Sequence, residues 1–183
     1  MHLGRMNDKM AKPAIFLDRD GTLNKNCPYC KSKEEIVLYD DIFEPLKELS
    51  KHFYIIVITN QSGIARGYFT EQALHEMNNK IKEEVERHGD RIDAFYYCPH
   101  MPDSGCKCRK PEPGLVYKAM EDFDIDLKHS FIVGDDDKDM QLAKRLSIIG
   151  IKVRNSQGSA DYFAKDFKDA LQIINSIRTK VKR

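Results

Sequence analysis

The sequence predicts an α/β fold in which helices cover both faces of a doubly wound, parallel β-sheet. Short apolar runs at 14–17, 55–58 and 131–133 have the length and composition of strands buried on both faces. Stretches of helical periodicity separate these runs, and such alternation is typical of parallel sheets. Each run ends at small or acidic polar residues, so a site is expected at the carboxyl edge of the sheet, where open α/β sheets bind ligands.

Local patterns predict the remaining elements. In chain order they are a helix at 41–51, a helix at 70–88, a strand at 94–97, helices at 114–123 and 138–146, a strand at 148–153 and a helix at 166–177. The helices carry apolar residues three and four positions apart. Thr70 is a preferred N-cap residue, and Gly89 is a preferred residue just past a helix end.

The length fits a single domain. The 183 residues suffice for one sheet covered on both sides. Residues 1–12 are polar and without period, so we expect a flexible tail there and a folded domain over 13–183. No interval between the expected elements is long enough for a large cap domain. The site is therefore expected to be open and walled by loops.

Charge and hydropathy exclude two classes of partner. Thirty basic and twenty-nine acidic residues leave a net charge of +1, which provides no long-range field for binding nucleic acid. No run reaches the ~18 apolar residues of a membrane span, and no secretory signal is evident. Five cysteines without such a signal indicate a reducing cytoplasm, where cysteines bind metal more often than they form disulfides. We expect a cytoplasmic monomer acting on a small molecule.

Two carboxylates follow the first expected strand directly, in Asp18-Arg19-Asp20-Gly21-Thr22. A pair with this spacing can hold a hard divalent cation while one carboxylate stays free to attack or to transfer a proton. The same residues are also common in ordinary turns. Thr59 and Asp135, which end the other two runs, favour phosphoryl transfer over the ordinary turn.

The order of the motifs resembles that of the haloacid-dehalogenase-like hydrolases over residues 13–154. The four motifs are Asp18-x-Asp20, Thr59, Lys110 and Gly134-Asp135. The resemblance implies a Rossmann-type fold and a phosphatase domain over 13–183. It also implies that Asp18 is the nucleophile of an aspartyl-phosphate intermediate and that Asp20 is the general acid and base.

The resemblance further implies a set of contacts to phosphate and to Mg²⁺. Thr59 and Lys110 would contact the transferring oxygens. The Mg²⁺ ligands would be Asp18, Asp20 and Asp135, with Asp136 as a further candidate. Asp136 stands where the resembled phosphatases commonly carry a lysine. The acidic run at 135–139 lacks the glycine of a calcium loop, and Asp137 or Asp139 is expected to cap the following helix.

Longer sequence segments indicate the expected substrate more narrowly. The segments 62–67 and 113–114 are similar to those of the D-glycero-D-manno-heptose-1,7-bisphosphate 7-phosphatase family, and the cysteine-containing words are shared with histidinol phosphatases. The resemblance implies cleavage of the 7-phosphate of a small phosphorylated sugar, with histidinol phosphate as the alternative. The residues implied in substrate binding are Arg19, Asn26, Cys27, Pro28, Tyr29, Asn60, Gln61, Ser62 and Arg109.

A second metal site is indicated by Cys98-x-His100 and Cys106-x-Cys108. Three thiolates and one imidazole complete a tetrahedral Zn²⁺ shell with no open position, which is a structural rather than a catalytic site. A zinc-bound loop of this kind would position the adjacent Arg109 and Lys110.

Cys27-Pro28-Tyr29-Cys30 has the spacing of a glutaredoxin-type redox motif. That motif needs a strand before it and a helix N-terminus after it, whereas residues 23–26 here belong to the loop after the nucleophile. A redox or second metal role and a plain loop beside the substrate both remain open.

Two other functions fit the sequence less well than a sugar phosphatase does. A phosphoacceptor receiver domain needs its aspartate at the end of an internal strand, where this chain has Thr59. A nucleic-acid end phosphatase needs a basic groove, which the balanced charge does not indicate.

Overall fold

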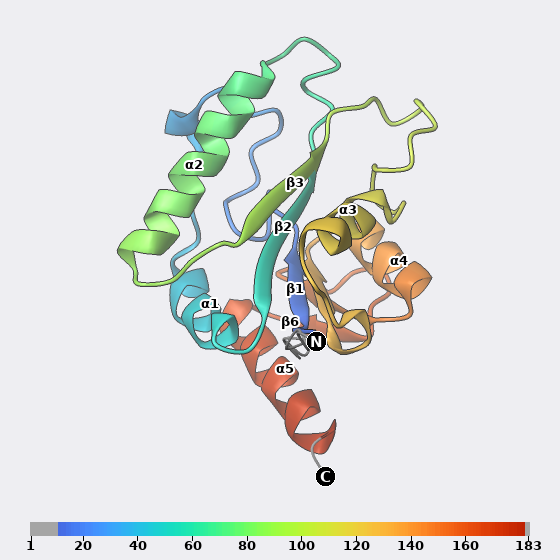
Figure 1. Ribbon diagram of the computed structural model, residues 1–183. Coiled ribbons are helices and arrows are strands. Elements are labelled where there is room, and N and C mark those ends of the chain that lie inside the picture. The colour runs from blue at the N-terminus through green and yellow to red at the C-terminus, as the bar shows by residue number, and fades with distance from the viewer. Residues whose placement is uncertain (1–10, 182–183) are drawn as a thin grey trace, which may run out of the picture.

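The computed structural model describes residues 11–181, and its centre is a six-stranded sheet in the order β3-β2-β1-β4-β5-β6 (Figure 1). All neighbouring strands pair in parallel. The strands are β1 (Ala14–Leu17), β2 (Tyr54–Asn60), β3 (Ala94–Cys98), β4 (Phe131–Gly134), β5 (Ile149–Val153) and β6 (Tyr162–Ala164). The predicted doubly wound parallel sheet is therefore confirmed.

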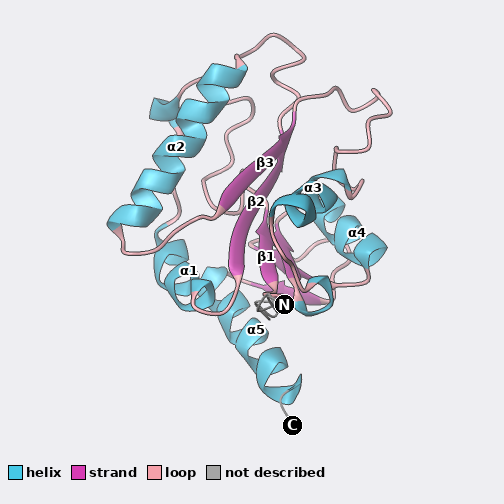
Figure 2. Ribbon diagram, in the orientation of Figure 1, coloured by secondary structure: helices cyan, strands magenta, loops and turns pink. Residues whose placement is uncertain are grey.

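Within residues 11–181, five α-helices cover the two faces of this sheet. They are α1 (Phe43–Ser50), α2 (Glu71–Arg87), α3 (Gly114–Asp122), α4 (Asp137–Leu146) and α5 (Phe167–Val181). Helices α1, α2 and α5 lie on one face, and α3 and α4 lie on the other (Figure 2). Three short 3-10 helices also occur, η1 (Lys33–Glu35), η2 (Asp40–Ile42) and η3 (Leu127–His129).

The alternation of side chains along β1 divides the interior into two cores. Ile15 and Leu17 pack toward α1, α2 and α5, whereas Ala14 and Phe16 pack toward α3 and α4. All four side chains are fully buried, as expected for a central strand of a parallel sheet. Because both faces are covered, a polar site is expected at the carboxyl ends of the strands, where open α/β sheets bind ligands.

The helix and strand positions agree with the sequence-based expectations apart from small shifts at their ends. Thr70 caps α2 by accepting a hydrogen bond from the backbone N–H of Ala73. The edge strand β6 was not predicted, because its three residues, of which Tyr162 and Phe163 are exposed, show no clear apolar run. None of the helices within residues 11–181 has the length and apolar character needed to cross a membrane.

The expected tail at 1–12 lies almost entirely outside the described residues. Lys12 falls within them, and it forms a parallel bridge with Ile125 and exchanges backbone hydrogen bonds with Asp124 and Asp126. The division into a tail and a domain over 13–183 stays a prediction.

Loops rather than a cap domain surround the carboxyl edge of the sheet. Between β1 and α1 the chain forms a loop, residues 18–42, that contains only η1 and η2. The loops at 61–70 and 99–113 leave β2 and β3 at the same end of the molecule (Figure 1). These three segments supply the walls of the site.

Candidate active site

A cavity of about 360 Å³ lies at the carboxyl edge of the sheet. Every residue predicted for catalysis, substrate binding or Mg²⁺ borders this one cavity. They are Asp18, Arg19, Asp20, Asn26, Cys27, Pro28, Tyr29, Thr59, Asn60, Gln61, Ser62, Arg109, Lys110, Asp135 and Asp136. Cys30, Gly63, Lys138 and Asp139 complete the lining. The structure therefore has a cavity at the carboxyl edge of the sheet, where the strand ends predicted a site.

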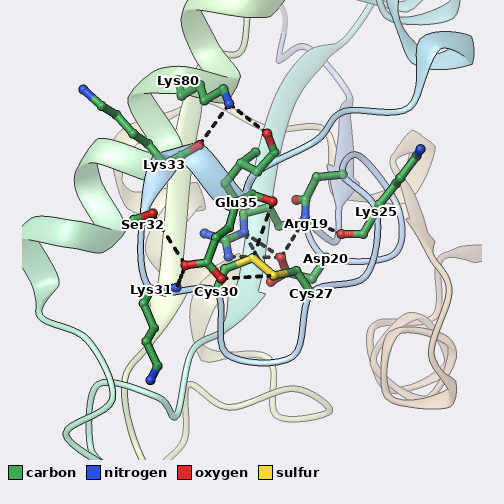
Figure 3. Close-up of a disulfide and its surroundings, with 12 residues drawn as sticks. Arg19, Asp20, Lys25, Cys27, Cys30, Lys31, Ser32, Lys33, Glu35 and Lys80 are labelled. Atoms are coloured by element: carbon green, nitrogen blue, oxygen red, sulfur yellow. Dashed lines mark hydrogen bonds and ion pairs between the residues drawn. A yellow bond between two sulfur atoms is a disulfide. The ribbon is translucent and has the colours of Figure 1, made fainter.

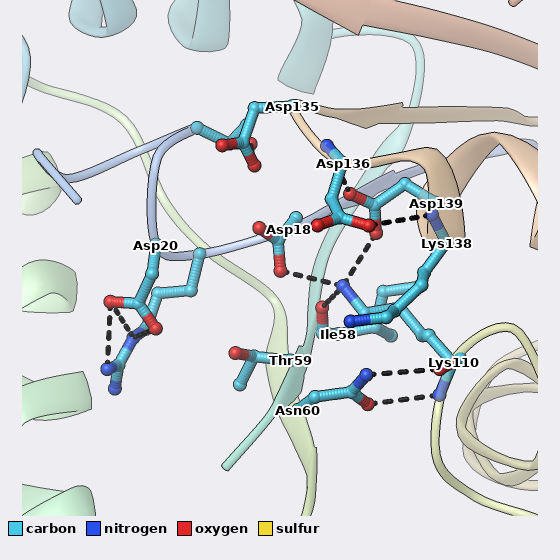
Figure 4. Close-up of polar contacts among 12 residues, drawn as sticks. Asp18, Asp20, Ile58, Thr59, Asn60, Lys110, Asp135, Asp136, Lys138 and Asp139 are labelled. Carbon is cyan, nitrogen blue, oxygen red and sulfur yellow. Dashed lines mark hydrogen bonds and ion pairs between the residues drawn. The ribbon is translucent and has the colours of Figure 1, made fainter. Parts of the chain in front are cut away.

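A buried ammonium group links two carboxylates at the floor of the cavity (Figure 4). Lys110 Nζ lies 2.6 Å from Asp18 Oδ1 and 2.7 Å from Asp139 Oδ1. It also donates to the backbone carbonyl of Ile58, at 2.9 Å. The Lys110 side chain is 3% exposed, so these three acceptors replace the water that the ammonium loses on folding.

Asp135 lies next to this ion pair because Gly21 lets it approach. Gly21 has a φ of +82°, and a Cβ atom at this position would lie 2.1 Å from Asp135 Oδ2. Thr22 Oγ1 donates to Asp135 Oδ1 at 3.4 Å. Any residue other than glycine at position 21 would displace the carboxylate and strain the turn.

The carboxylates of Asp18, Asp135 and Asp139 form a cluster whose oxygen atoms lie within 4.8 Å of one another. Burial raises the pKa of Asp18, against the opposing effect of Lys110, and burial together with Asp139 raises the pKa of Asp135. Burial also lowers the pKa of Lys110, but Asp139 and Asp18 outweigh it and raise that pKa overall. Three carboxylates thus lie close together while the Lys110 ammonium contacts two of them, Asp18 and Asp139, and a hard divalent cation fits this oxygen donor set.

Asp136, the fourth candidate ligand, has a different position. Its side chain accepts from the backbone N–H of Lys138 at 2.8 Å and caps α4, in a capping box completed by Asp139. The expectation that Asp137 or Asp139 caps the helix is confirmed for Asp139, which accepts a hydrogen bond from the backbone N–H of Asp136 at 3.3 Å, but the N-cap residue itself is Asp136, because the helix begins one residue earlier than predicted. Asp139, rather than Asp136, is the third acid of the cluster.

Asp20 is held away from this cluster by its own set of donors. Arg19 Nη2 lies 3.0 Å from Asp20 Oδ1, Asn24 Nδ2 donates to the same oxygen at 2.9 Å, and Gln61 Nε2 donates to Oδ2 at 2.9 Å. Arg19 is buried and is also bound to Asn78 on α2, at 3.1 Å. In this structure Arg19 orients Asp20, and Figure 4 shows Asp20 across the cavity from Lys110.

Residues at the end of β2 fix the neighbouring groups. Thr59 is buried, and its hydroxyl accepts from Gln61 Nε2 at 2.8 Å. Asn60 makes two hydrogen bonds with the backbone of Lys110: its Nδ2 donates to the carbonyl at 3.1 Å, and its Oδ1 accepts from the N–H at 3.0 Å. Asn60 thereby connects β2 to the segment that carries Lys110.

The four predicted zinc ligands gather beside the cavity in the loop after β3. Cys98 Sγ lies 3.5 Å from His100 Nδ1, 3.5 Å from Cys106 Sγ and 3.0 Å from Cys108 Sγ. All four ligand atoms lie within 4.8 Å of one another. The donor set matches a closed tetrahedral zinc site, and it immediately precedes Arg109, which borders the cavity.

Cys27 and Cys30 form a disulfide. The expectation that the cysteines stay reduced is wrong for this pair, because the turn between them brings their Cα atoms to 5.4 Å, within the range of protein disulfides. Asn26, Pro28 and Tyr29 border the cavity beside it.

Sequence reasoning missed the role of Asp139 and the support that Asn78 gives to Arg19. Asp139 is the last acid of the run at 135–139, four residues after Asp135. This spacing puts one carboxylate before α4 and the other on the inward face of its first turn. The contact of Asn78 with Arg19 could not be predicted, because a polar residue within a helix is usually on the solvent-exposed face.

A model of the polynucleotide kinase 3 phosphatase family matches residues 14–177. The chain belongs to this family. More broadly it is a haloacid-dehalogenase-like hydrolase, because it is 31% identical to the "putative had-like phosphatase" of Mesorhizobium loti, whose crystal structure has a TM-score of 0.82; the match covers 92% of this chain and 87% of that one. The fold alone is also shared with a HAD-superfamily hydrolase from Geobacter sulfurreducens, which is 14% identical and has a TM-score of 0.59 over 89% of this chain and 100% of its own.

Closer relatives are phosphatases of heptose bisphosphates. The protein named "Probable D-glycero-D-manno-heptose-1,7-bisphosphate 7-phosphatase" from Thermoplasma acidophilum is 42% identical over 145 residues, 78% of this chain and 91% of its own. The D-glycero-alpha-D-manno-heptose-1,7-bisphosphate 7-phosphatase of Campylobacter jejuni is 36% identical, over 93% of this chain and 99% of its own. The chain is thus a phosphoric monoester hydrolase.

A solved structure supports the same relationship. The crystal structure of D,D-heptose 1.7-bisphosphate phosphatase from B. bronchiseptica complexed with magnesium and phosphate has a TM-score of 0.81 and 28% identity. The match covers 90% of this chain and 99% of that one.

The contrast between Asp139 and Asp136 gives a testable prediction. Asp139→Asn should lower phosphatase turnover about 10- to 100-fold, the range typical of groups that orient metal ligands, because Lys110 loses a charged partner. Asp136→Asn should cost much less, because asparagine also caps helices well. Initial rates of phosphate release from both variants check this. An equal loss in both would contradict the assignment of the third acid to Asp139.

Proposed function

We propose that the protein is a Mg²⁺-dependent phosphatase that removes the 7-phosphate of D-glycero-D-manno-heptose 1,7-bisphosphate through an aspartyl-phosphate. The observation that carries the chemistry is the pair of separately held carboxylates. Asp18 lies against Lys110 at 2.6 Å, whereas Asp20 faces the same cavity from a different set of donors. One carboxylate is thereby suited to attack phosphorus and the other to move a proton.

Asp18 is the proposed nucleophile. Its side chain is 12% exposed and borders the cavity, while the contact with Lys110 restricts its orientation. Lys110 holds Oδ1, and the other oxygen is left for in-line attack on phosphorus. Lys110 and Thr59 then stabilise the charge that builds up on the transferring oxygens.

Asp20 is the proposed general acid and base. It would protonate the oxygen of the departing sugar and afterwards take a proton from the water that hydrolyses the aspartyl-phosphate. The donors from Asn24 and Gln61 fix both of its oxygens. A side chain that must act twice at one phosphorus atom benefits from such restraint.

Mg²⁺ would be held by Asp18 and Asp135, with the backbone of Asp20 as a third contact and Asp139 beside them. The excess of carboxylate over ammonium in this cluster supports the assignment. When bound, the ion reduces the repulsion between the anionic nucleophile and the phosphate. The relative crystallised with magnesium and phosphate provides independent support.

The sugar and its second phosphate would lie toward Arg109 and the loop at 26–30, which form the outer part of the cavity lining. Arg109 offers a planar fork for a phosphate or a pair of hydroxyls. The names of the relatives at 36 to 42% identity support a heptose bisphosphate over histidinol phosphate. The family model bears the name of a nucleic-acid phosphatase, but the net charge of +1 supports a small substrate.

The zinc cluster would act as a structural clamp. A metal bound to Cys98, His100, Cys106 and Cys108 fixes the loop that leads into Arg109 and Lys110, where few buried apolar side chains are available. Gly114, at the start of α3, lies close to the backbone of this loop: a Cβ atom on Gly114 would be 2.3 Å from the carbonyl oxygen of Lys107. The close contact between this loop and the start of α3 leaves little room for an alternative path.

The two aspartates make separable predictions. Asp18→Asn should abolish turnover, because the nucleophile and one metal ligand are lost together. Asp20→Asn should reduce turnover by at least ~10², the lower range for general acid–base catalysis. Phosphate release measures both, and circular dichroism confirms that the variants fold. Wild-type turnover in either variant would refute the mechanism.

One tightly bound zinc per chain is expected. Replacing both Cys106 and Cys108 by serine should remove it and lower activity, because Arg109 and Lys110 lose their support. Elemental analysis of purified protein, before and after the substitution, measures the metal directly. Fully active wild-type protein without zinc would rule out the clamp.

Substrate choice can be tested directly with purified enzyme. The kcat/KM for heptose 1,7-bisphosphate should exceed that for histidinol phosphate and for 3′-phosphorylated oligonucleotides. Arg109→Ala should raise KM for the bisphosphate, because a remote contact is lost. A higher kcat/KM for histidinol phosphate would reject the heptose assignment and leave the phosphatase chemistry intact.

A further inference from the structure

The Cys27–Cys30 disulfide closes a four-residue turn at the mouth of the cavity (Figure 3). Cys30 is buried in the core beneath α2, and Cys27 is half-buried. The backbone N–H of Cys30 donates to the carbonyl of Cys27 at 3.2 Å. All four residues of the turn border the cavity that contains Asp18 and Asp20.

Tyr29 lies at the tip of this turn in an unfavourable backbone conformation. Its φ is +56°, in the left-handed region that favours glycine, and its side chain is exposed. A residue other than glycine stays in this region only where its surroundings restrain it. The flanking disulfide is the covalent restraint next to it.

The ring of Tyr29 connects two walls of the cavity. It packs edge-on against Tyr68, with ring centroids 4.9 Å apart, and the guanidinium of Arg66 lies 5.6 Å from the centre of the ring. Tyr68 and Arg66 belong to the loop after β2, whereas Tyr29 belongs to the loop after β1. Tyr29, which borders the cavity, therefore joins the loop after β1 to the loop after β2.

The base of the turn is anchored independently of the disulfide. Lys80 on α2 donates to the carbonyl oxygens of Lys33 and Ile36, at 3.0 and 2.9 Å. The carboxylate of Glu35 accepts from the backbone N–H of Lys31 at 3.1 Å. Opening the disulfide would thus free the tip of the turn while η1 stays attached to α2.

The surroundings of the two sulfur atoms do not suit a thiol-disulfide oxidoreductase. Such enzymes lower the pKa of the attacking thiol with a helix N-terminus or a cation. Here only the three-residue η1 follows the motif, and a Glu35 carboxylate oxygen lies 3.9 Å from Cys27 Sγ. A carboxylate this close disfavours a thiolate, so the pair is suited to hold a conformation rather than to exchange electrons with a substrate.

We propose that the Cys27–Cys30 disulfide positions Tyr29 for substrate binding, so that reduction of the disulfide weakens the binding of substrate without removing the catalytic groups. The proposal rests on the proposed function in so far as the substrate reaches past its reacting phosphate to the mouth of the cavity. Asp18, Asp20 and Lys110 are not bonded to the turn, and their contacts remain in the reduced protein.

Reduction breaks one bond, between Cys27 Sγ and Cys30 Sγ. With a trialkylphosphine as reductant, the phosphine gives up two electrons and takes the oxygen of one water molecule to become a phosphine oxide. The two protons of that water reach the two sulfur atoms, which become thiols. A small disulfide compound reverses the change, because it accepts the two electrons and is itself reduced to two thiols.

The first arm of the test needs no substrate. Thiol titration of denatured, chelator-treated protein should find three free thiols before reduction, those of Cys98, Cys106 and Cys108, and five after it. Trypsin should then cut the reduced protein several-fold faster at the exposed Lys25 and Lys31, which flank the turn. Equal cleavage rates in the two states would overturn the proposal, whichever phosphate ester the enzyme hydrolyses.

The second arm measures kinetics with heptose 1,7-bisphosphate. Phosphine treatment should raise KM about 5- to 10-fold with kcat changed less than about twofold, and reoxidation should restore KM. The double variant Cys27→Ser with Cys30→Ser should show the raised KM with or without phosphine. Its response separates this disulfide from the zinc-site cysteines, because a phosphine effect that persists in the double variant would overturn the proposal.

Tyr29→Ala in the oxidised enzyme completes the design. It should raise KM to a similar extent and abolish the dependence of KM on phosphine. If Tyr29→Ala keeps the redox dependence, the disulfide acts through another residue and the proposal is wrong. Failure of the oxidised wild-type enzyme to hydrolyse the heptose bisphosphate would instead refute the proposed function. The trypsin experiment uses no substrate, so it would still test whether the disulfide holds the turn.

Discussion

The buried contact of Lys110 with Asp18 and Asp139 is the constraint on which the arrangement of the site depends. A buried ammonium without partners would be very costly, so the segment that carries Lys110 must lie where β1 and α4 present their carboxylates. Asn60 fixes the backbone of that segment from β2 through two hydrogen bonds. Three elements far apart in the sequence are thereby held to one side chain.

The excess of acid around Lys110 links structure to chemistry. The two carboxylates that contact Lys110 carry more negative charge than its one ammonium can balance, and Asp135 adds a third carboxylate close by. Burial raises the pKa values of Asp18 and Asp135 in this environment, which means that the charged forms are disfavoured until a cation joins them. A divalent cation bound here would offset the excess of negative charge among the three carboxylates.

Most of the fold could be predicted from the sequence, because apolar runs that end at polar residues indicate both the sheet and its functional edge, whereas the individual residues of the site were predicted from the resemblance of the four motifs to a known family. The details that escaped prediction depend on contacts between distant segments. Asp139 looked like a helix cap, and its pairing with Lys110 becomes visible only when α4 lies against the cavity. The disulfide was not expected, because its formation depends on a turn at Tyr29 that the sequence pattern does not specify.

The loop at 25–36 and the loop that carries the cysteine cluster rest on opposite cores of the interior. Cys30 and Ile36, at the two ends of the η1 segment, belong to the core beneath α1, α2 and α5, whereas Cys98 and the helices that flank the Lys110 segment belong to the opposite core. The buried side chains that support the loop at 25–36 are therefore a different set from those that pack beneath the cysteine cluster next to Lys110. A substitution in the core beneath α1, α2 and α5 should therefore disturb the loop at 25–36 more directly than the zinc-site loop, whose buried Cys98 packs in the opposite core.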